Sequence, residues 1–339
     1  MKAAVLHEFK KPLSIEDVPQ PVLDPEDLLI RVEACGVCHS DLHVADGDWP
    51  QFTKITKRPL ILGHEIARRV AEMGERVADF QIGDRVGVPW VYWTCGACDC
   101  CREGNENLCV RQKITGVTVD GGFADFVKAP ACHAVRIPEG LSATEAAPLF
   151  CAGVTVYRAL RRARMAPGQR LAIFGIGGLG QFAVQLGREW GADVIAVDVS
   201  EDKLELANSL GAISVLNTAT TNVVKELRGK GGVHVALVTA AAKAAYDTAF
   251  GCLRPTGTLL VVGLPSENLS FPAILMAAGE VHIQASAVGT RQDLREVLAL
   301  GAAGKLSCHV TAHPLGDING ILEQLRHGQI SGRTAIVSS

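Results

Sequence analysis

The chain has 339 residues, with 33 basic and 36 acidic side chains and a net charge of −3. This length is sufficient for two domains with separate hydrophobic cores. The charges are interspersed, so no basic stripe indicates nucleic-acid binding. The most apolar stretch, residues 146–160, is too short to cross a bilayer, and residues 1–6 do not resemble a secretory signal. We therefore expect a cytoplasmic protein with no membrane or nucleic-acid partner.

The first 90 residues alternate short β-rich runs with turns that contain Pro, Gly and Asp. This spacing predicts a partly open β-barrel-like domain. The expected strands are residues 2–6, 28–34, 69–73 and 85–88, followed by 123–127 and 132–137 after a cysteine-rich lobe at 90–112.

That lobe holds five of the eleven cysteines. In a chain of this length without a secretory signal, clustered cysteines indicate a metal site. Cys95, Cys98, Cys101 and Cys109 have the spacing Cys-x2-Cys-x2-Cys-x7-Cys. Four thiolates close a tetrahedral shell and leave no position for substrate, which predicts a structural zinc. The long last gap disfavours the alternative, an iron–sulfur cluster. Cys100 interrupts the spacing, and we expect it not to be a ligand.

Three separated residues form a second candidate metal set. Cys38, His64 and Cys151 would supply two thiolates and one imidazole, which leaves the open fourth position that catalytic zinc requires. Glu65 follows His64 and is a candidate carboxylate beside the metal or an exchanging ligand. Taken singly, the cysteines could equally be small buried hydrophobic residues and His64 a packed core histidine.

Residues 170–198 predict a strand, a tight turn, a helix and a second strand. Gly175, Gly177 and Gly180 form a Gly-x-Gly-x-x-Gly turn after the apolar run 171–174, and Gly178 and Leu179 lie in the same turn. Backbone amides at the start of the helix would hold a pyrophosphate. Asp198 ends the second strand, 23 residues after Gly175. At about this spacing a carboxylate reaches the hydroxyls of the adenosine ribose, and its charge would repel a 2′-phosphate. This pattern predicts NAD rather than NADP, and the alternative is the same unit without a ligand.

From residue 152 helices alternate with strands, which predicts an α/β fold with a doubly wound parallel sheet of six strands. A helix is expected at 154–164, and the further strands are expected at 214–216, 233–238, 258–262 and 283–288. A helix at 293–303 would return the chain to the first domain, which residues 335–337 would complete. The expected boundaries are 1–151 and 292–339 for the catalytic domain and 152–291 for the inserted nucleotide-binding domain.

Several motifs occur together in one order. They are Cys38-His39-Ser40-Asp41-Leu42-His43, Gly63-His64-Glu65, the four-cysteine lobe, Gly121-Gly122-Phe123-Ala124, Cys151-Ala152-Gly153-Val154-Thr155 and the turn from Gly175 to Gly180. Over essentially its whole length the sequence resembles zinc-containing alcohol dehydrogenases of the medium-chain family, in the bacterial and usually tetrameric branch. The resemblance implies a GroES-like catalytic domain, two zinc ions per chain, NAD and a homotetramer.

The resemblance also implies roles for single residues. Cys38, His64 and Cys151 would hold catalytic zinc, Ser40 would accept the substrate proton, and His43 would pass it to solvent through the cofactor ribose. Trp49 and Trp90 would line the substrate pocket. The remaining cofactor contacts would be His39 near the pyrophosphate, Lys203 at the adenosine ribose, and Thr155, Gly263, Val288 and Arg333 around the dinucleotide.

One position departs from the family. Arg68 stands where these enzymes usually have glycine, and a guanidinium near a metal site needs a carboxylate or open water. Glu65 and Glu72 are the two candidate partners.

The sequence thus predicts an NAD-dependent zinc enzyme that interconverts primary, and some secondary or aromatic, alcohols with aldehydes and ketones. A polyol or sugar-alcohol dehydrogenase of the same fold is the alternative, although Trp49 and Trp90 argue against a roomy polar pocket. A more distant alternative is a nonenzymatic zinc protein that binds nucleotide as a redox regulator.

Overall fold

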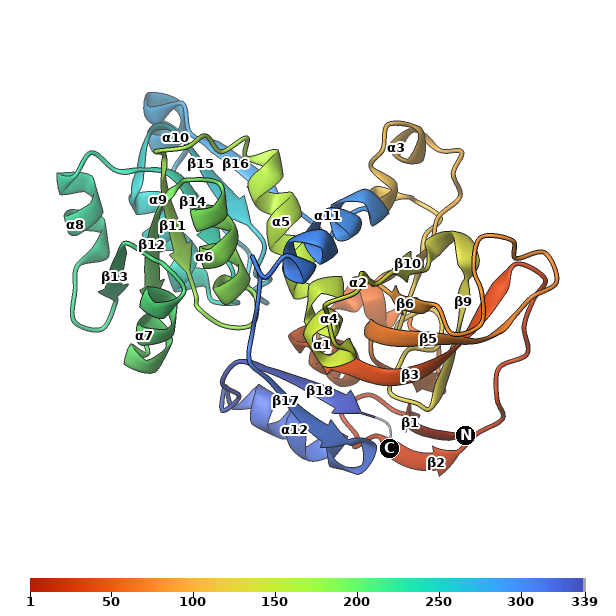
Figure 1. The fold of residues 1–339 in the computed structure, drawn as a ribbon. Coiled ribbons are helices and arrows are strands. Elements are labelled where there is room, and N and C mark those ends of the chain that lie inside the picture. The colour runs from red at the N-terminus through yellow and green to blue at the C-terminus, as the bar shows by residue number, and fades with distance from the viewer. Residues whose placement is uncertain (338–339) are drawn as a thin grey trace. The chain divides into compact units, whose positions relative to one another are not determined.

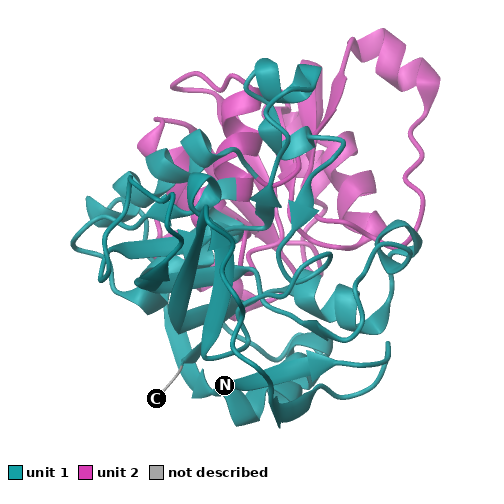
Figure 2. Ribbon diagram, turned by 90° about the vertical axis from the view of Figure 1, so that its right-hand side faces the viewer, with its two compact units in different colours: residues 1–154, 289–339 teal, residues 155–288 magenta. Residues whose placement is uncertain are grey.

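The computed structural model describes residues 1–337, and these form two compact units. Unit 1 contains residues 1–154 and the segment from 289 onward, and unit 2 contains residues 155–288 (Figure 2). The boundaries expected from the sequence lie within a few residues of these. No helix within residues 1–337 is long and apolar enough to cross a membrane.

Unit 1 is mainly a β structure. Its largest sheet has the strand order β10-β6-β5-β3-β18-β17, with β9 also pairing with β3, and a smaller sheet has the order β2-β1-β4 (Figure 1). The strands are β1 (Lys2–Leu6), β2 (Ser14–Asp17), β3 (Asp27–Val37), β4 (Leu60–Ile61), β5 (Glu65–Met73), β6 (Arg85–Val88), β7 (Val91–Trp93), β8 (Lys113–Ile114), β9 (Phe126–Pro130), β10 (Val135–Arg136), β17 (Val310–Pro314) and β18 (Arg333–Val337).

Strand β3 organises unit 1 because it pairs with three other strands. Gly36 lies opposite Glu65 of β5 and also opposite Ala335 of β18. Residues from the start of β5 and from β18, far apart in the sequence, are therefore neighbours at the end of β3. The core around this sheet is apolar and includes the fully buried side chains of Leu6, Leu60 and Phe123.

The helices that begin or lie in unit 1 are α1 (His39–Asp46), α2 (Pro50–Thr53), α3 (Asp99–Arg102), α4 (Ala143–Ala146), α5 (Ala152–Arg162), α11 (Arg291–Ala302) and α12 (Ile318–Arg326). Helix α1 starts directly after β3, with Cys38 as its N-cap, and it ends at Gly47 in the left-handed conformation (φ +68°). A residue without Cβ adopts this conformation at little cost, so the glycine fixes where α1 stops.

Unit 2 contains a parallel sheet with the order β13-β12-β11-β14-β15-β16. Its strands are β11 (Arg170–Phe174), β12 (Asp193–Asp198), β13 (Ser214–Asn217), β14 (Val233–Val238), β15 (Leu253–Val261) and β16 (His282–Ala285), and its helices are α6 (Gly180–Glu189), α7 (Glu201–Ser209), α8 (Val223–Gly229), α9 (Lys243–Gly251) and α10 (Ala273–Gly279). Helices α6 and α7 contact β12, and α9 contacts β14 and β15. The predicted six-stranded doubly wound sheet is confirmed.

Some predicted strand limits are wrong. The strand expected at 132–137 is a 3-10 helix, Ala131–His133, followed by the short β10, because Pro130 ends β9 and leads into the turn. The strand expected at 123–127 begins only at Phe126, since Phe123 instead bonds through its backbone to Leu62 and Ala4. Strand β16 ends at Ala285, and Val288 after it has a positive φ of 39°, which does not continue a strand.

Candidate active site and metal centres

The three separated metal candidates meet in unit 1. Cys38 caps α1, His64 precedes β5, and Cys151 precedes α5. Together with Glu65 they offer ligand atoms that all lie within 4.8 Å of one another, and all four residues are buried. The Sγ atoms of Cys38 and Cys151 are 3.9 Å apart. This is the mixed sulfur and nitrogen donor set that binds zinc.

Asp41 orients His64 toward this cluster. Its Oδ1 lies 2.8 Å from His64 Nδ1 and also accepts the Gly63 N–H, while its Oδ2 accepts the Cys38 N–H at 2.9 Å. A carboxylate oxygen only accepts, so Nδ1 donates and Nε2 keeps its lone pair. Within the described residues Nε2 is buried without any hydrogen-bond partner. An orphaned imidazole nitrogen beside two cysteine sulfurs fits a metal ion as its missing partner.

The direction of the Cys38 pKa shift agrees with this fit. The hydrogen bond from the Cys151 thiol holds the pKa of Cys38 well below its ordinary value, despite burial. A thiolate is the form of cysteine that binds metal. The lowered pKa of Cys38 thus favours the form of the side chain that can hold a metal ion.

Glu65 is completely buried and pairs with Arg333, whose Nη2 donates to both carboxylate oxygens. The glycine at position 36 makes room for this pair, because a Cβ there would lie 1.9 Å from Glu65 Oε2. Burial raises the pKa of Glu65 to about 7, and Arg333 opposes the rise. Arg333 is itself only 5% exposed, so it is no surface charge. Its dinucleotide contact remains a prediction.

The expected partners of Arg68 are wrong. Its Nε lies 3.5 Å from Glu33 Oε2, and its side chain is partly exposed. Positions 65 and 68 are three positions apart on β5, so their side chains face opposite sides of the sheet. Position 72 lies about 13 Å further along the strand than position 68. Arg68 therefore does not pair with Glu65, whose partner is Arg333.

Aromatic rings form a continuous series from His43 to His64. The distances between ring centroids are 4.7 Å for His43 and Trp49, 5.4 Å for Trp49 and Phe52, and 5.9 Å for Phe52 and Trp90. The Trp90 ring then meets His64 edge-on at 4.9 Å. The sequence predicts the two tryptophans but not Phe52, although Phe52 follows Trp49 by three positions.

Ser40 and His43 lie on α1, three residues apart, so their side chains share one helix face. His39 begins the same helix. The role of Asp41 beside the metal candidates was not predicted, although Asp41 lies inside the Cys-His-Ser-Asp motif.

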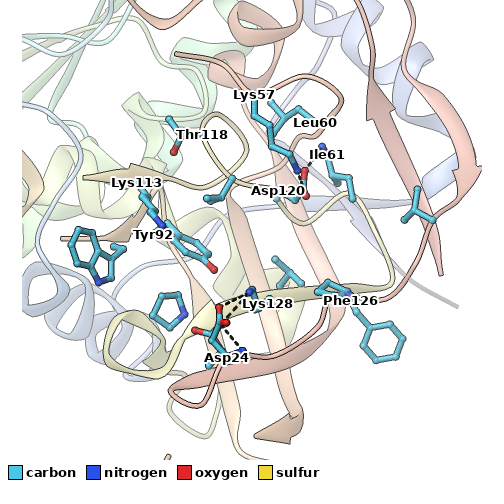
Figure 3. Close-up of a pocket in the computed structure, with 18 of the residues that line it drawn as sticks. Asp24, Lys57, Leu60, Ile61, Tyr92, Lys113, Thr118, Asp120, Phe126 and Lys128 are labelled. Carbon is cyan, nitrogen blue, oxygen red and sulfur yellow. Dashed lines mark hydrogen bonds and ion pairs between the residues drawn. The ribbon is translucent and has the colours of Figure 1, made fainter. Parts of the chain in front are cut away.

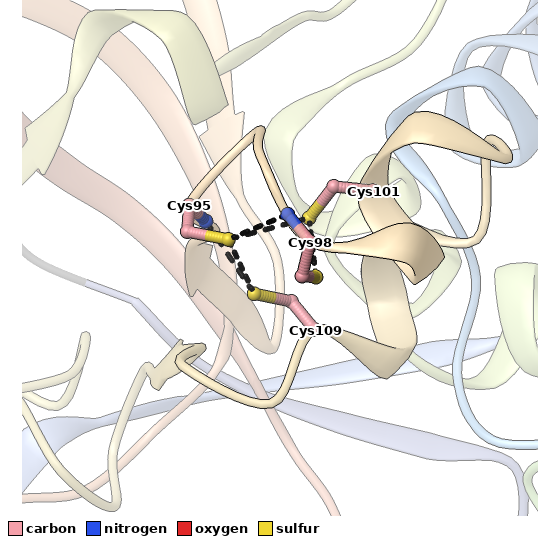
Figure 4. A group of neighbouring side chains, drawn as sticks. All are labelled: Cys95, Cys98, Cys101 and Cys109. Atoms are coloured by element: carbon pink, nitrogen blue, oxygen red, sulfur yellow. Dashed lines mark hydrogen bonds between the residues drawn. The ribbon is translucent and has the colours of Figure 1, made fainter.

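The four-cysteine group closes in space (Figure 4). The Sγ–Sγ distances are 3.5 Å for Cys98–Cys101, 3.6 Å for Cys95–Cys109 and 4.0 Å for Cys95–Cys101. Backbone N–H groups of Ala97 and Cys98 donate to Cys95 Sγ and lower the pKa of Cys95 to about 5. Four converging sulfurs with amide donors fit a tetrahedral zinc. Cys100 does not belong to the group that the described residues form.

An ion pair anchors this lobe within unit 1. Glu106 accepts hydrogen bonds from the backbone N–H and Nε of Arg291, both at 2.9 Å, and from its Nη2 at 2.5 Å. Arg291 is the first residue of α11, and its Nη1 also donates to the carbonyl oxygen of Cys132. The lobe is therefore tied to the C-terminal segment of unit 1.

In unit 2 the glycine turn has the geometry of a phosphate-binding loop. Gly175 has φ +97°, and a Cβ at Gly180 would lie 2.0 Å from the Gly175 oxygen. At Gly177 an added Cβ would meet nothing within 4 Å, so the backbone there is open to a ligand. Asp198 accepts the N–H groups of Ile176 (2.7 Å), Val199 (2.8 Å) and Ser200 (3.1 Å), which links the acid to the turn.

The other expected cofactor residues of unit 2 lie partly around this turn. Gly263 and Gly175 both pack against Thr239 and Ala240, so the carboxyl ends of β11, β14 and β15 meet there. Lys203 lies in the first turn of α7, two residues after its start. Thr155 and Val288 are the terminal residues of the unit. Gly178 and Leu179 complete the loop before α6. All these contacts with a cofactor stay predictions.

Unit 1 also has a cavity away from the metal clusters. It has a volume of about 1060 Å³, and Tyr92, Lys113, Asp120 and Lys128 are among the side chains that line it (Figure 3). None of the residues proposed for metal or proton transfer lines it, so this cavity is not the proposed reaction site.

Comparisons with known proteins agree with this geometry. Residues 24–139 match the family described as alcohol dehydrogenase GroES-like domain, and residues 178–303 match the zinc-binding dehydrogenase family. An alcohol dehydrogenase of Geobacillus stearothermophilus is 46% identical over 99% of both chains. The chain belongs to the zinc-containing alcohol dehydrogenases.

Solved structures of the family superpose on the whole chain. The alcohol dehydrogenase of the archaeon Aeropyrum pernix has a TM-score of 0.93 and 39% identity, with complete coverage of both chains. The acetophenone reductase of Geotrichum candidum, solved in complex with NAD, has a TM-score of 0.91 and 30% identity, and the match covers 99% of this chain and 97% of that one. The family and fold predicted from the sequence are confirmed.

Proposed function

We propose that this alcohol dehydrogenase uses NAD to interconvert primary, and some secondary or aromatic, alcohols with aldehydes and ketones. The observation that carries the proposal is the convergence of Cys38, His64 and Cys151, with His64 Nε2 buried and unpartnered beside two sulfurs. Three ligands leave a fourth position for a substrate oxygen. A zinc ion held by these three residues would act as a Lewis acid and stabilise negative charge on the substrate oxygen.

The residues of the chain orient the substrate and move its proton. Ser40 lies two residues after Cys38, and we infer that its hydroxyl accepts the substrate proton. His43, on the same face of α1 and partly exposed, carries the proton to solvent. Trp49, Phe52 and Trp90 provide an apolar wall between His43 and His64. Such a wall suits aliphatic and aromatic alcohols better than polyols.

NAD supplies the hydride acceptor when it is bound. We infer that the open backbone at Gly177 receives its pyrophosphate and that Asp198 selects NAD over NADP. Lys203, Gly263, Thr155 and Val288 belong to the same proposal, as do His39 and Arg333 of unit 1. The second metal group, formed by the four lobe cysteines, would hold a structural zinc. The acetophenone reductase bound to NAD supports this cofactor.

We further propose a cytoplasmic homo-oligomer, a tetramer as the family expectation has it. Strand β16 is an edge of the six-stranded sheet, and Ile283 on it is 37% exposed. The adjoining α10 buries none of its residues and exposes Ile274 and Leu275. An unpaired edge with apolar neighbours favours association with a second sheet.

Zinc counting combined with an alcohol panel tests the function. We expect two zinc ions per chain and rapid NAD reduction with ethanol, butanol and benzyl alcohol. Cys38→Ala should lose one zinc ion and the activity. The control is Cys35→Ala, because Cys35 is a buried cysteine of β3 outside the metal group, and this variant should keep both zinc ions and the activity. Far faster oxidation of sorbitol would favour the polyol alternative, and NAD binding without turnover of any alcohol would favour the regulator.

A further inference from the structure

The side chains of His43 and Asp48 face each other at the end of α1. His43 Nδ1 and Asp48 Oδ2 are 2.8 Å apart, a length typical of a charge-assisted hydrogen bond. Because carboxylate oxygens only accept, Nδ1 is the nitrogen that carries hydrogen. In the neutral ring this leaves Nε2 as the nitrogen that can take up a proton.

The backbone brings Asp48 to this position. The left-handed residue Gly47 folds the chain back, and the Asp48 N–H donates to the His43 carbonyl oxygen at 3.0 Å. An added Cβ at Gly47 would lie 3.2 Å from the Phe9 ring, so the turn favours glycine for space as well as for φ. Thr53 Oγ1 donates to the Gly47 carbonyl oxygen and holds the turn from the other side.

Two contacts together fix the His43 ring. Trp49 lies against it with ring centroids 4.7 Å apart, and Asp48 holds one nitrogen. The neighbouring acid Asp46 has a different partner, because it accepts from Arg326 Nη2 at 2.8 and 3.0 Å. The two acids at the end of α1 therefore have separate tasks, and Asp46 provides a matched comparison for Asp48.

We propose that Asp48 is a positioning residue for proton transfer, which holds His43 in the tautomer and orientation that leave Nε2 available as the acceptor. This inference rests on the proposed function, in which His43 carries the substrate proton to solvent. It adds a carboxylate and histidine pair to the serine and histidine expected from the family resemblance.

A double-mutant cycle tests the proposal. The rate of the first turnover of alcohol oxidation is measured by stopped flow, so that product release does not mask the effect. We expect His43→Ala to slow this turnover by about 100-fold, at the low end for a general acid-base group. Asp48→Ala should slow it about tenfold, the effect of losing one hydrogen bond to a charged group. Affinity for the alcohol and zinc content should be unchanged.

The decisive result is the combined variant. If Asp48 acts through His43, adding Asp48→Ala to His43→Ala should cause no further loss. Asp48→Asn keeps an oxygen that accepts from Nδ1 and should retain most of the activity, and Asp46→Asn should retain all of it. Zinc content and melting temperature identify any variant that misfolds, and Asp48→Ser then replaces Asp48→Ala.

Two other outcomes overturn the inference in different ways. If His43→Ala turns over like the unmodified enzyme, the proposed proton route through His43 fails, and the role of Asp48 fails with it. If His43→Ala is slow but Asp48→Ala is not, or if the two losses multiply in the double variant, the route through His43 stands and Asp48 does not act through it.

Discussion

Asp41 links the backbone and side chains of the buried metal cluster. It accepts hydrogen bonds from the Cys38 and Gly63 backbones and from His64, so one carboxylate fixes two ligands from different elements. Removing such a carboxylate typically reduces metal affinity or activity by about 10- to 100-fold. At the scale of single residues, hydrogen bonds of this kind hold the metal-binding side chains in position.

Asp198 gives a prediction for cofactor choice. We expect Asp198→Asn to weaken NAD binding more than NADP binding, because the lost negative charge no longer repels a 2′-phosphate. The variant also loses acceptor capacity for the amides of Ile176, Val199 and Ser200, which affects both cofactors, so the ratio of the two dissociation constants is the informative measurement. Asp193→Asn, at the other end of β12, is the control. Equal losses for both cofactors would show that the acid does not discriminate.

His133 gives a prediction for pH dependence. Its side chain is buried, its Nε2 lies 3.0 Å from Thr94 Oγ1, and burial with nearby Arg291 lowers its pKa from 6.5 to about 4. The unfolded chain therefore binds a proton at higher pH than the folded one, so this residue reduces stability as pH falls from about 6.5 toward 4. Between pH 7.5 and 5 the loss is on the order of 2 kcal/mol.

The measurement is urea unfolding at both pH values for the unmodified protein and for His133→Asn. Other groups also titrate in this range, so the difference between the two proteins isolates His133. We expect the variant to lose less stability on acidification, and identical losses would contradict the assignment.

At the scale of elements, helix α3 of the cysteine lobe buries none of its residues, so apolar burial of this helix does not hold the lobe together. Metal binding should therefore contribute to its folding. We expect Cys95→Ser to lose one zinc per chain and to lower the melting temperature by several degrees, since about 1 kcal/mol shifts it by 2–4 °C in a large domain. Cys100→Ser, in the same lobe but outside the metal group, should change neither. Unchanged zinc content in Cys95→Ser would refute the structural site.

At the scale of the whole molecule, the two edges of the sheet in unit 2 allow a direct test of assembly. Ile283 on β16 and Val215 on β13 lie on opposite edges, and each is 37% exposed. We expect Ile283→Asp to shift the protein to a smaller species in sedimentation velocity, since a buried charge opposes pairing of the edges. Val215→Asp should leave the species unchanged. An equal response from both variants would place the interface elsewhere.

The sequence determined the family, the two metal sets and the glycine turn, because each depends on residue types at fixed local spacing. The six parallel strands followed from apolar periodicity, although the limits of β9, β10 and β16 did not. Only the tertiary structure decided the partners that chain topology brings together: Asp41 for His64, Glu33 rather than Glu65 or Glu72 for Arg68, and Arg333 for Glu65 across 268 positions. Local spacing in the sequence does not reveal such contacts, because they depend on the order of the strands and on the direction of each side chain in the folded protein.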